Sequence, residues 1–546
     1  MKTTKIAILQ LTRIGDLIQT AQATRQFRAE NPDSHITLIA RRKFASGLTF
    51  LLETVFDEII LFDTSDFFKK KNFSDAKKST HNFISDLKKY DFDFLINLSF
   101  SKSSSYLSSL INTKEILGIH RNSRAEVAIN DRWSQYVYSN VMNGANSSFS
   151  LVDVYRYILG CQHTHLLDSP EETRSNKIVI HPFASSKKKS WGINKWVELI
   201  YKVASELNDF EIHLVGSKQD SLEADRLIQS PSLKKYSHRI FSHTKNYTIA
   251  DTYQLLMDAK LFIGHDSMVS HLASETLTPG IVLSLGTVRP YETTPYGKNF
   301  INIAPKNKCF PCLPQENCDL LPCHNSINYQ VVNVIAKGLI SGEKISSLYL
   351  KAHLTPFHLN TVSIYKTSFR DNTGLEIKEI SENYKTIKNV FQDYYKIIWQ
   401  YYLRNVEIDS SLPDITPEVA KELYEYLNGT NYLFELYNFG VKYSNKIIEQ
   451  TSKADLDFKL IQEDIVKLGE IDQLCSITKK SYPFMGGLVD YFYVNKANAI
   501  GENITDITKH NLLNYYDASN LVSVINDFIE KSVKPHLTKS EKISEV

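Results

Sequence analysis

Three features are scarce in this chain of 546 residues: cysteine, long apolar runs and an excess of either charge. Six cysteines are far too few to build a disulfide-based scaffold. No stretch approaches the roughly 18 apolar residues that a membrane-spanning helix needs, so we expect no transmembrane segment. The 63 basic and 61 acidic side chains give a net charge of only +2, which argues against a dedicated nucleic-acid-binding protein.

The N-terminal sequence MKTTKIAILQLTRIGDL lacks the features of a secretory signal. Its apolar run is short and is broken by Thr12, Arg13 and Asp16. This pattern predicts a first β-strand. We therefore expect a cytoplasmic protein, with peripheral attachment to the inner membrane left open.

The first half of the chain alternates short β-branched runs with helix-forming, charge-rich stretches, which is typical of parallel-sheet α/β folds. Each run is apolar enough for a strand that is buried on both faces. A polar stretch at 168–177 separates a first series from a second. The expected strands cover residues 5–10, 35–40, 58–62 and 94–99, then 177–182, 211–216, 261–266 and 280–286.

After Ile340 this alternation stops, and apolar and aromatic residues recur at spacings of three and four, as in 382–405. That spacing predicts helices. The length alone suggests about three domains, with an interlobe linker at about 166–176. We expect an N-terminal α/β lobe at 1–167, a second at 168–344 with a cysteine-rich loop at 309–323, and a mainly α-helical extension at 345–546.

Gly15 and Asp16 lie where the first strand ends and a helix begins. That edge of an α/β sheet is where ligands bind. A carboxylate there can serve as a general base for an attacking hydroxyl. The alternative is that Asp16 only caps the helix.

Two further strand-to-helix turns carry polar groups. The sequence HPFASSKKKSW offers backbone N–H groups and Lys189 to a diphosphate, although a lysine run is also common in solvated loops. In LFIGHDSMVSHLASE, the turn at Asp266, Ser267 and Met268 exposes a helix N-terminus. We expect His271, one turn further on, to hold that turn. Thr287 follows the next strand and suits a cleft wall.

The most specific spacing is CFPCLPQENCDLLPC, a C-x2-C-x5-C-x4-C arrangement. Four thiolates so close in sequence can complete one tetrahedral shell of zinc or, less often, iron. Such a site has no vacant position and is structural. Free or redox-active thiols are the alternative. The four residues are Cys309, Cys312, Cys318 and Cys323.

In their order and spacing, these elements resemble glycosyltransferase family 9, the ADP-heptose heptosyltransferases of bacterial surface glycans. The resemblance spans about residues 4–340. It rests on RIGDLIQT, HPFASSKKKSW, LVGSKQD, LFIGHDSMVSHLA, LSLGTVRPYETTPYG and the cysteine loop ending in CHNSI. It leaves the helical extension unexplained.

The resemblance implies a GT-B fold, in which two facing Rossmann-like lobes bind the donor mainly through the second lobe and the acceptor through the first. It implies that Asp16 is the catalytic base, with Gly15 on the acceptor side. It places Lys189 against the donor phosphates and Asp220, after Gly216, near the nucleoside ribose. The remaining donor-side residues are Asp266, Ser267, Met268, His271 and Thr287.

Two positions depart from the family pattern. Met268 stands where the family has glycine, which permits the closest approach of backbone to phosphate. Asp220 stands where a glutamate is usual. We therefore expect a modified donor pocket.

The resemblance implies an inverting transfer from a nucleotide-diphosphate sugar, with ADP-heptose as the first candidate and no catalytic metal. A non-heptose transferase, a sugar-nucleotide epimerase and a catalytically silent glycan- or protein-binding module remain alternatives. The acceptor is either a glycan such as lipopolysaccharide or a protein such as flagellin or an autotransporter. For the extension we expect acceptor recognition or homo-oligomerisation.

Overall fold

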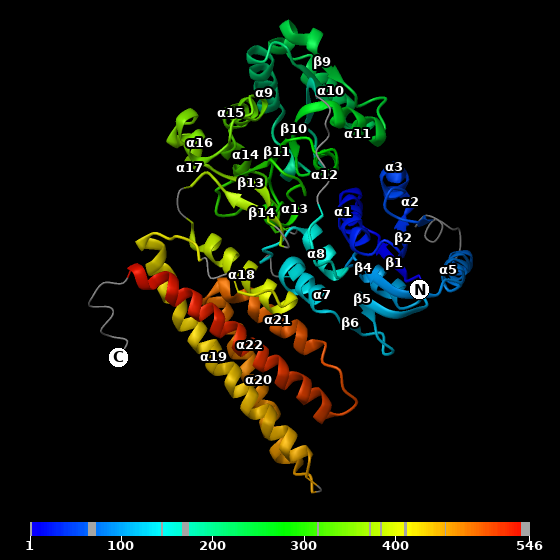
Figure 1. Ribbon diagram of the computed structural model, residues 1–546, viewed down its shortest axis with the longest axis vertical. Coiled ribbons are helices and arrows are strands. Elements are labelled where there is room, and N and C mark those ends of the chain that lie inside the picture. Colours follow the sequence, from blue (N-terminus) through cyan, green and yellow to red (C-terminus); the bar gives the residue numbers. More distant parts are fainter. Residues whose placement is uncertain are drawn as a thin grey trace. The chain divides into compact units, whose positions relative to one another are not determined.

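The computed structural model describes residues 3–63, 73–143, 146–165, 174–313, 316–370, 373–382, 385–408, 412–453 and 455–536. Most of the predicted interlobe linker at 166–176 lies outside these residues. The chain forms two compact units, which are described separately (Figure 1). Unit 1 comprises residues 1–116 and 149–383, and unit 2 comprises residues 117–148 and 384–546.

The first sheet has the strand order β3-β2-β1-β4-β5-β6. Strands β1 to β4 pair in parallel, as their doubly buried apolar runs predict, and β5 and β6 pair antiparallel. Helix α1 (Ile14–Glu30) directly follows the first strand. The strands are β1 (Lys5–Gln10), β2 (His35–Arg41), β3 (Glu58–Phe62), β4 (Phe92–Asn97), β5 (Thr113–Arg121) and β6 (Val127–Ile129), and α5 (Phe73–Leu87) precedes β4.

The second sheet has the order β14-β13-β12-β11-β10-β7-β8-β9. Its strands β7 to β12 pair in parallel. They are β7 (Ser175–His181), β8 (Glu211–Leu214), β9 (Ile240–Ser242), β10 (Ala259–His265), β11 (Gly280–Leu283) and β12 (Phe300–Pro305). The main helices between and after them are α9 (Ile193–Glu206), α10 (Ser221–Ile228), α11 (Ile249–Asp258), α12 (Met268–Glu275) and α15 (Tyr329–Ile340).

The antiparallel edge of this sheet differs from the sequence-based expectation. Strands β13 (Val362–Arg370) and β14 (Gly374–Glu379) extend the sheet beyond β12. They lie in the segment after residue 344 for which we expected a mainly helical extension. The sheet therefore continues well past the last strand expected from the sequence.

Each sheet has one topological switch point, where successive connections leave in opposite directions. In the first sheet it lies between β1 and β4, and in the second between β7 and β10. Ligands of open α/β sheets bind outside the carboxyl ends of the strands at such points. Asp16 follows β1, whereas the lysine run and Asp266 follow β7 and β10.

A buried ion pair on α8 (Leu151–Ile158) connects this helix to the second sheet. Asp153 accepts hydrogen bonds from Arg156 Nε and the Tyr296 hydroxyl, each at 2.8 Å, and from Leu375 N at 2.9 Å. Both side chains of the Asp153–Arg156 pair are fully buried. Removing one partner of such a pair is costly, because the other charge is left desolvated.

Unit 2 is mostly helical, which confirms the helical nature of the C-terminal region. Its helices α19 and α22 pack along one another, and Phe391, Tyr394 and Ile398 of α18 are buried. None of the described helices combines the length and apolarity needed to cross a membrane. The helices are α18 (Ile387–Arg404), α19 (Pro417–Thr451), α20 (Phe458–Ser481), α21 (Gly486–Ala497) and α22 (Ile504–Val533).

Residues 117–148 belong to unit 2, although they lie within the range expected for the first lobe. The rings of Tyr136 and Trp399 meet edge to face with centroids 5.6 Å apart. Gln392 donates to Ser147 O at 3.0 Å, and Asn498 accepts from Ile129 N at 2.7 Å. The helical unit therefore contains a segment from the first third of the chain.

Gly374 offers a direct test of the α8 contact. Its φ is +83°, and a Cβ there would collide with the Asp153 carboxylate. We expect Gly374→Ala to lower unfolding free energy by about 2–5 kcal/mol, from left-handed backbone strain plus overpacking. Gly160→Ala is the matched control, because φ is +87° but nothing lies within 4 Å; it is expected to cost about 1–2 kcal/mol. Equal thermal unfolding midpoints for the two variants would contradict this packing.

Candidate functional site

Asp16 lies in the first turn of α1 and is half-buried. Its Oδ2 accepts a hydrogen bond from the backbone N–H of Arg13 at 3.0 Å. The carboxylate therefore has the capping contact that we considered as the alternative function. Capping occupies one oxygen, so it fixes the side chain without excluding a second role for Oδ1.

The buried amide of Gln10 organises the turn that carries Asp16. Gln10 Oε1 accepts from Thr12 N at 3.2 Å and from Thr12 Oγ1 at 2.5 Å, while Nε2 donates to Thr20 Oγ1 at 3.0 Å. Thr20 Oγ1 in turn donates to the backbone oxygen of Asp16 at 2.8 Å. Gln10 was not among the site residues predicted from the sequence, although a glutamine at the end of an otherwise apolar strand is a usable signal.

Tyr155 of α8 is a second buried neighbour of this turn. Burial, and then the charge of Asp16, raise the pKa of its hydroxyl well above the ordinary value. The phenol therefore stays neutral and adds no competing negative charge beside the carboxylate. Tyr155 was also missed from the sequence.

In the second lobe, two polar side chains lie close to the Asp266 carboxylate. Lys189 Nζ lies 3.8 Å from Asp266 Oδ2, and His271 Nε2 lies 3.9 Å from Asp266 Oδ1. Asp266 Oδ1 and His271 Nδ1 are buried and have no hydrogen-bond partner within the described part of the chain. The structure thus places these three predicted residues together, and the two atoms without partners mark a polar site with unused hydrogen-bonding capacity.

The two lobes meet at His271. A Cβ built on Gly15 would lie 3.2 Å from His271 Cδ2, which is tighter than an ordinary contact. Burial lowers the pKa of His271, and the charges of Asp266 and Asp16 partly oppose that effect. The Gly15 turn of the first lobe therefore lies beside His271 of the second, and the Asp16 carboxylate acts electrostatically on that imidazole.

Helix α12 begins at this site. Ser267 is its N-cap residue, and its hydroxyl lies 3.1 Å from Nδ1 of His181, whose pKa burial lowers to about 4. Met268 is the first helical residue, so its backbone has a conformation that any side chain adopts. The methionine therefore changes the space in front of the helix, not the path of the backbone.

Contacts behind the lysine run fix its position. His265 Nε2 accepts from Trp191 N at 2.8 Å, and its Nδ1 lies 3.2 Å from Phe183 O. Burial lowers the pKa of His265 to about 3, so the ring is neutral and can accept. Gly286 has a φ of +62° and no side chain. The carbonyl oxygen of Lys188 therefore lies only 2.6 Å from the position that a Cβ of residue 286 would occupy.

The cysteine-rich loop lies against the lysine run and the Gly286 turn. Cys312 N donates to Gly286 O at 2.8 Å, His324 Nε2 lies 3.0 Å from Lys188 O, and Lys188 Nζ contacts Glu316 O. Thr287, next to Gly286, is half-buried. The loop therefore supports the segment that carries Lys189.

The four thiols of this loop influence one another. Burial raises the pKa of Cys312, and the neighbouring thiols Cys323, Cys309 and Cys318 raise it further. Of the residues that the structure describes, no three His, Cys, Asp or Glu side chains are arranged as a metal-ligand set; residues 314–315 of the loop lie outside the described ranges. Metal binding therefore stays a prediction.

Gly216 and Asp220 form a separate turn after β8. Asp220 Oδ2 accepts from Ser217 N at 2.7 Å and from Ser217 Oγ at 2.6 Å. A Cβ on Gly216 would lie 2.6 Å from the Phe183 ring. The carboxylate thus caps the turn, and its expected contact with a ribose stays a prediction.

The family model of glycosyltransferase family 9 (heptosyltransferase) matches residues 80–321. Similar solved structures include E. coli heptosyltransferase WaaC with ADP, which is 18% identical over 55% of this chain and 92% of that chain, with a TM-score of 0.43. E. coli ADP-heptose LPS heptosyltransferase II is 16% identical over 62% and 99%, with a TM-score of 0.45.

The iron-containing dodecameric glycosyltransferase TibC from enterotoxigenic E. coli is 14% identical over 63% of this chain and 78% of that chain, with a TM-score of 0.36. No curated protein matches the chain in sequence. The two mostly parallel α/β sheets agree with the predicted pair of Rossmann-like lobes. The match to glycosyltransferase family 9 (heptosyltransferase) therefore covers residues 80–321 and leaves helices α18 to α22 outside it.

Proposed function

We propose that this enzyme transfers heptose from ADP-heptose to an acceptor hydroxyl with inversion at the anomeric carbon. The supporting observation is the approach of Gly15, which precedes Asp16, to His271. In the second lobe, His271 and Lys189 both lie within 4 Å of Asp266. Heptosyltransferase WaaC and TibC have each been solved with an ADP-linked heptose. A base and a diphosphate site in one place meet the requirements of direct displacement.

In this proposal Asp16 Oδ1 takes the proton from the acceptor hydroxyl as its oxygen attacks the anomeric carbon. The bond from that carbon to the diphosphate oxygen breaks, and ADP leaves with the electron pair. The capping bond to Arg13 N holds the carboxylate in place. Preorganisation of this kind lowers the barrier without reorganisation during the reaction.

The departing diphosphate is stabilised by Lys189 and by the N-terminus of α12. The Lys189 side chain is 19% exposed, so its charge is only partly screened. The first turn of α12 adds the backbone N–H group of Met268 and the Ser267 hydroxyl, because Ser267 N already donates to Ser270 Oγ at 3.2 Å. Gly216, Asp220 and Thr287 are proposed to contact the nucleoside side of the donor.

The acceptor is proposed to be a bacterial surface glycan or a protein. A non-heptose transferase and a sugar-nucleotide epimerase are the alternatives within the enzyme class, and they differ in a simple assay. Donor isomerised without acceptor indicates an epimerase, whereas sugar joined to an acceptor indicates a transferase. A catalytically silent binding module would do neither.

Unit 2 is proposed to act in acceptor recognition or self-association. Its helices α19 and α20 expose large apolar side chains, among them Tyr432, Phe439 and Phe458. Unit 1 already contains every residue that the proposed chemistry uses. An added unit with exposed aromatic residues suits a role in binding.

Asp16→Asn is expected to reduce transfer at least about 100-fold, because the amide is a poor base. The amide oxygen still accepts from Arg13 N, so ADP affinity is expected to stay within about twofold. The assay measures transfer of labelled heptose from ADP-heptose to an extract of source cells that lack this protein. Asp251→Asn is the control, since Asp251 Oδ2 caps α11 in the same way, accepting from Thr248 N at 2.8 Å. Wild-type transfer by Asp16→Asn would remove Asp16 from the mechanism.

We also propose a structural metal at the cysteine-rich loop, either zinc or iron. The C-x2-C-x5-C-x4-C spacing of its cysteines supports this assignment. Such an ion would tie the loop together and so hold the lysine run. No catalytic step passes through it.

Elemental analysis of protein purified without a metal-affinity tag is expected to find about one zinc or iron per chain. Cys309→Ser and Cys318→Ser are expected to lose the metal and lower the thermal unfolding midpoint, because the ion stabilises the folded loop. Cys161→Ser is the control, since Cys161 is buried away from the loop. Metal-free protein with four freely titrating loop thiols would exclude the site.

A further inference from the structure

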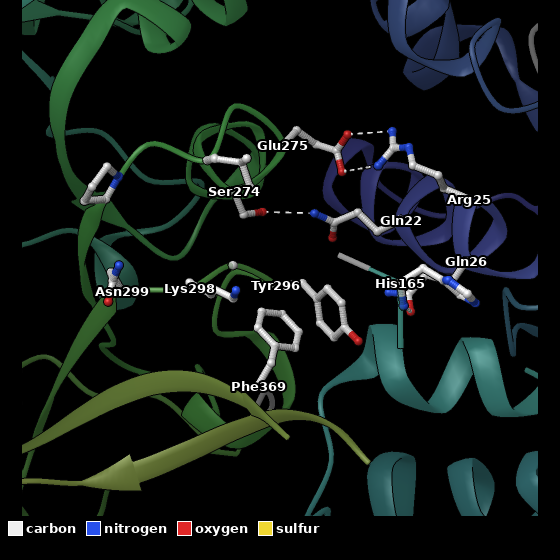
Figure 2. Close-up of a pocket in the computed structure, with 13 residues that line it drawn as sticks. Gln22, Arg25, Gln26, His165, Ser274, Glu275, Tyr296, Lys298, Asn299 and Phe369 are labelled. Carbon is white, nitrogen blue, oxygen red and sulfur yellow. Dashed lines mark hydrogen bonds and ion pairs between the residues drawn. The ribbon is translucent and has the colours of Figure 1, made fainter. Parts of the chain in front are cut away.

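Helices α1 and α12, which carry the proposed chemistry at their first turns, are joined again further along by polar bonds. Arg25 donates through Nη1 to Glu275 Oε1 at 3.1 Å and through Nη2 to Oε2 at 2.7 Å. Gln22 Nε2 donates to Ser274 Oγ at 3.0 Å. Figure 2 shows these bonds side by side, and we call the four residues the interlobe latch.

The ion pair of the latch is largely removed from water. The Glu275 side chain is only 2% exposed and that of Arg25 is 29% exposed. Burial by itself would lower the pKa of the Arg25 guanidinium, but the Glu275 carboxylate outweighs burial and raises it. A desolvated pair of this kind holds α1 and α12 firmly in one relative position, because breaking it leaves a buried charge without a partner.

Below the latch the lobes do not pack tightly. A cavity lies there, lined by Gln22, Gln26, Leu277, Tyr296 and Phe369 among others (Figure 2). Gln22 Oε1 borders it, buried and without a hydrogen-bond partner in the described ranges. Polar bonds, and not continuous apolar packing, therefore hold α1 against α12 at this level.

The latch is connected to the site through both helices. Ser274 Oγ donates to the backbone oxygen of His271 at 2.7 Å. Arg25 and Asp16 belong to the same uninterrupted helix α1. A shift at Arg25 therefore changes the position of Asp16 relative to Asp266 and His271.

We propose that Arg25 and Glu275 are positioning residues whose ion pair sets the lobe arrangement in which transfer occurs. This inference rests on the proposed transfer reaction. Neither residue touches the reacting atoms in this account. Loss of the ion pair is expected to impair transfer, which needs both lobes in the correct relative position. Nucleotide binding, which uses the second lobe alone, is expected to persist.

The test compares Arg25→Gln and Glu275→Gln with Arg28→Gln. Arg28 is one turn further along α1, but its ion pair with Asp57, at 2.6 Å, lies within the first lobe. We expect either latch variant to lose at least about tenfold in kcat for heptose transfer, while ADP affinity stays within about twofold. The double variant Arg25→Gln/Glu275→Gln is expected to recover part of the rate, because no buried charge is left unpaired.

Small-angle scattering gives a readout that does not depend on activity. Arg25→Gln and Glu275→Gln are expected to have a larger radius of gyration than the wild type and Arg28→Gln. If the two variants expand but the wild type transfers no heptose, the role of the latch is supported and the proposed reaction is rejected. Unchanged scattering and rate in both latch variants would overturn the latch.

Discussion

The approach of Gly15 to His271 is the constraint on which the site depends. Glycine has no side chain, so the first turn of α1 comes within contact distance of the imidazole on the opposite lobe. That approach brings Asp16 close enough to affect the pKa of His271. In the proposed reaction, this approach unites the proton acceptor from one sheet with the phosphate site from the other.

Most of the remaining architecture holds the two sides of this contact in place. On the first lobe, Gln10 joins the end of β1 to the first turns of α1 through Thr12 and Thr20. On the second, His265 and the cysteine-rich loop fix the lysine run from behind. Gln10 and His265 are buried and uncharged, so these two supports add no charge beside the site.

The sequence predicted both α/β lobes, because strands buried on both faces are local apolar runs. It also located Asp16, Lys189 and Asp266, since each follows such a run at a strand-to-helix turn. It missed β13 and β14, and it did not assign residues 117–148 to the helical unit. Those arrangements depend on partners far away in sequence, as when Asn498 accepts from Ile129 N. Local periodicity carries no information about such pairings.

The Gly15→Ala variant tests the central contact most directly. The added methyl group meets His271 Cδ2 at 3.2 Å, so the imidazole or the turn must move by a few tenths of an ångström. ADP titration by calorimetry and heptose transfer are measured on the same protein, with Gly192→Ala as the control because nothing lies within 4 Å of that position. The account predicts nearly unchanged ADP affinity with transfer reduced about tenfold or more. Full transfer by Gly15→Ala would contradict it.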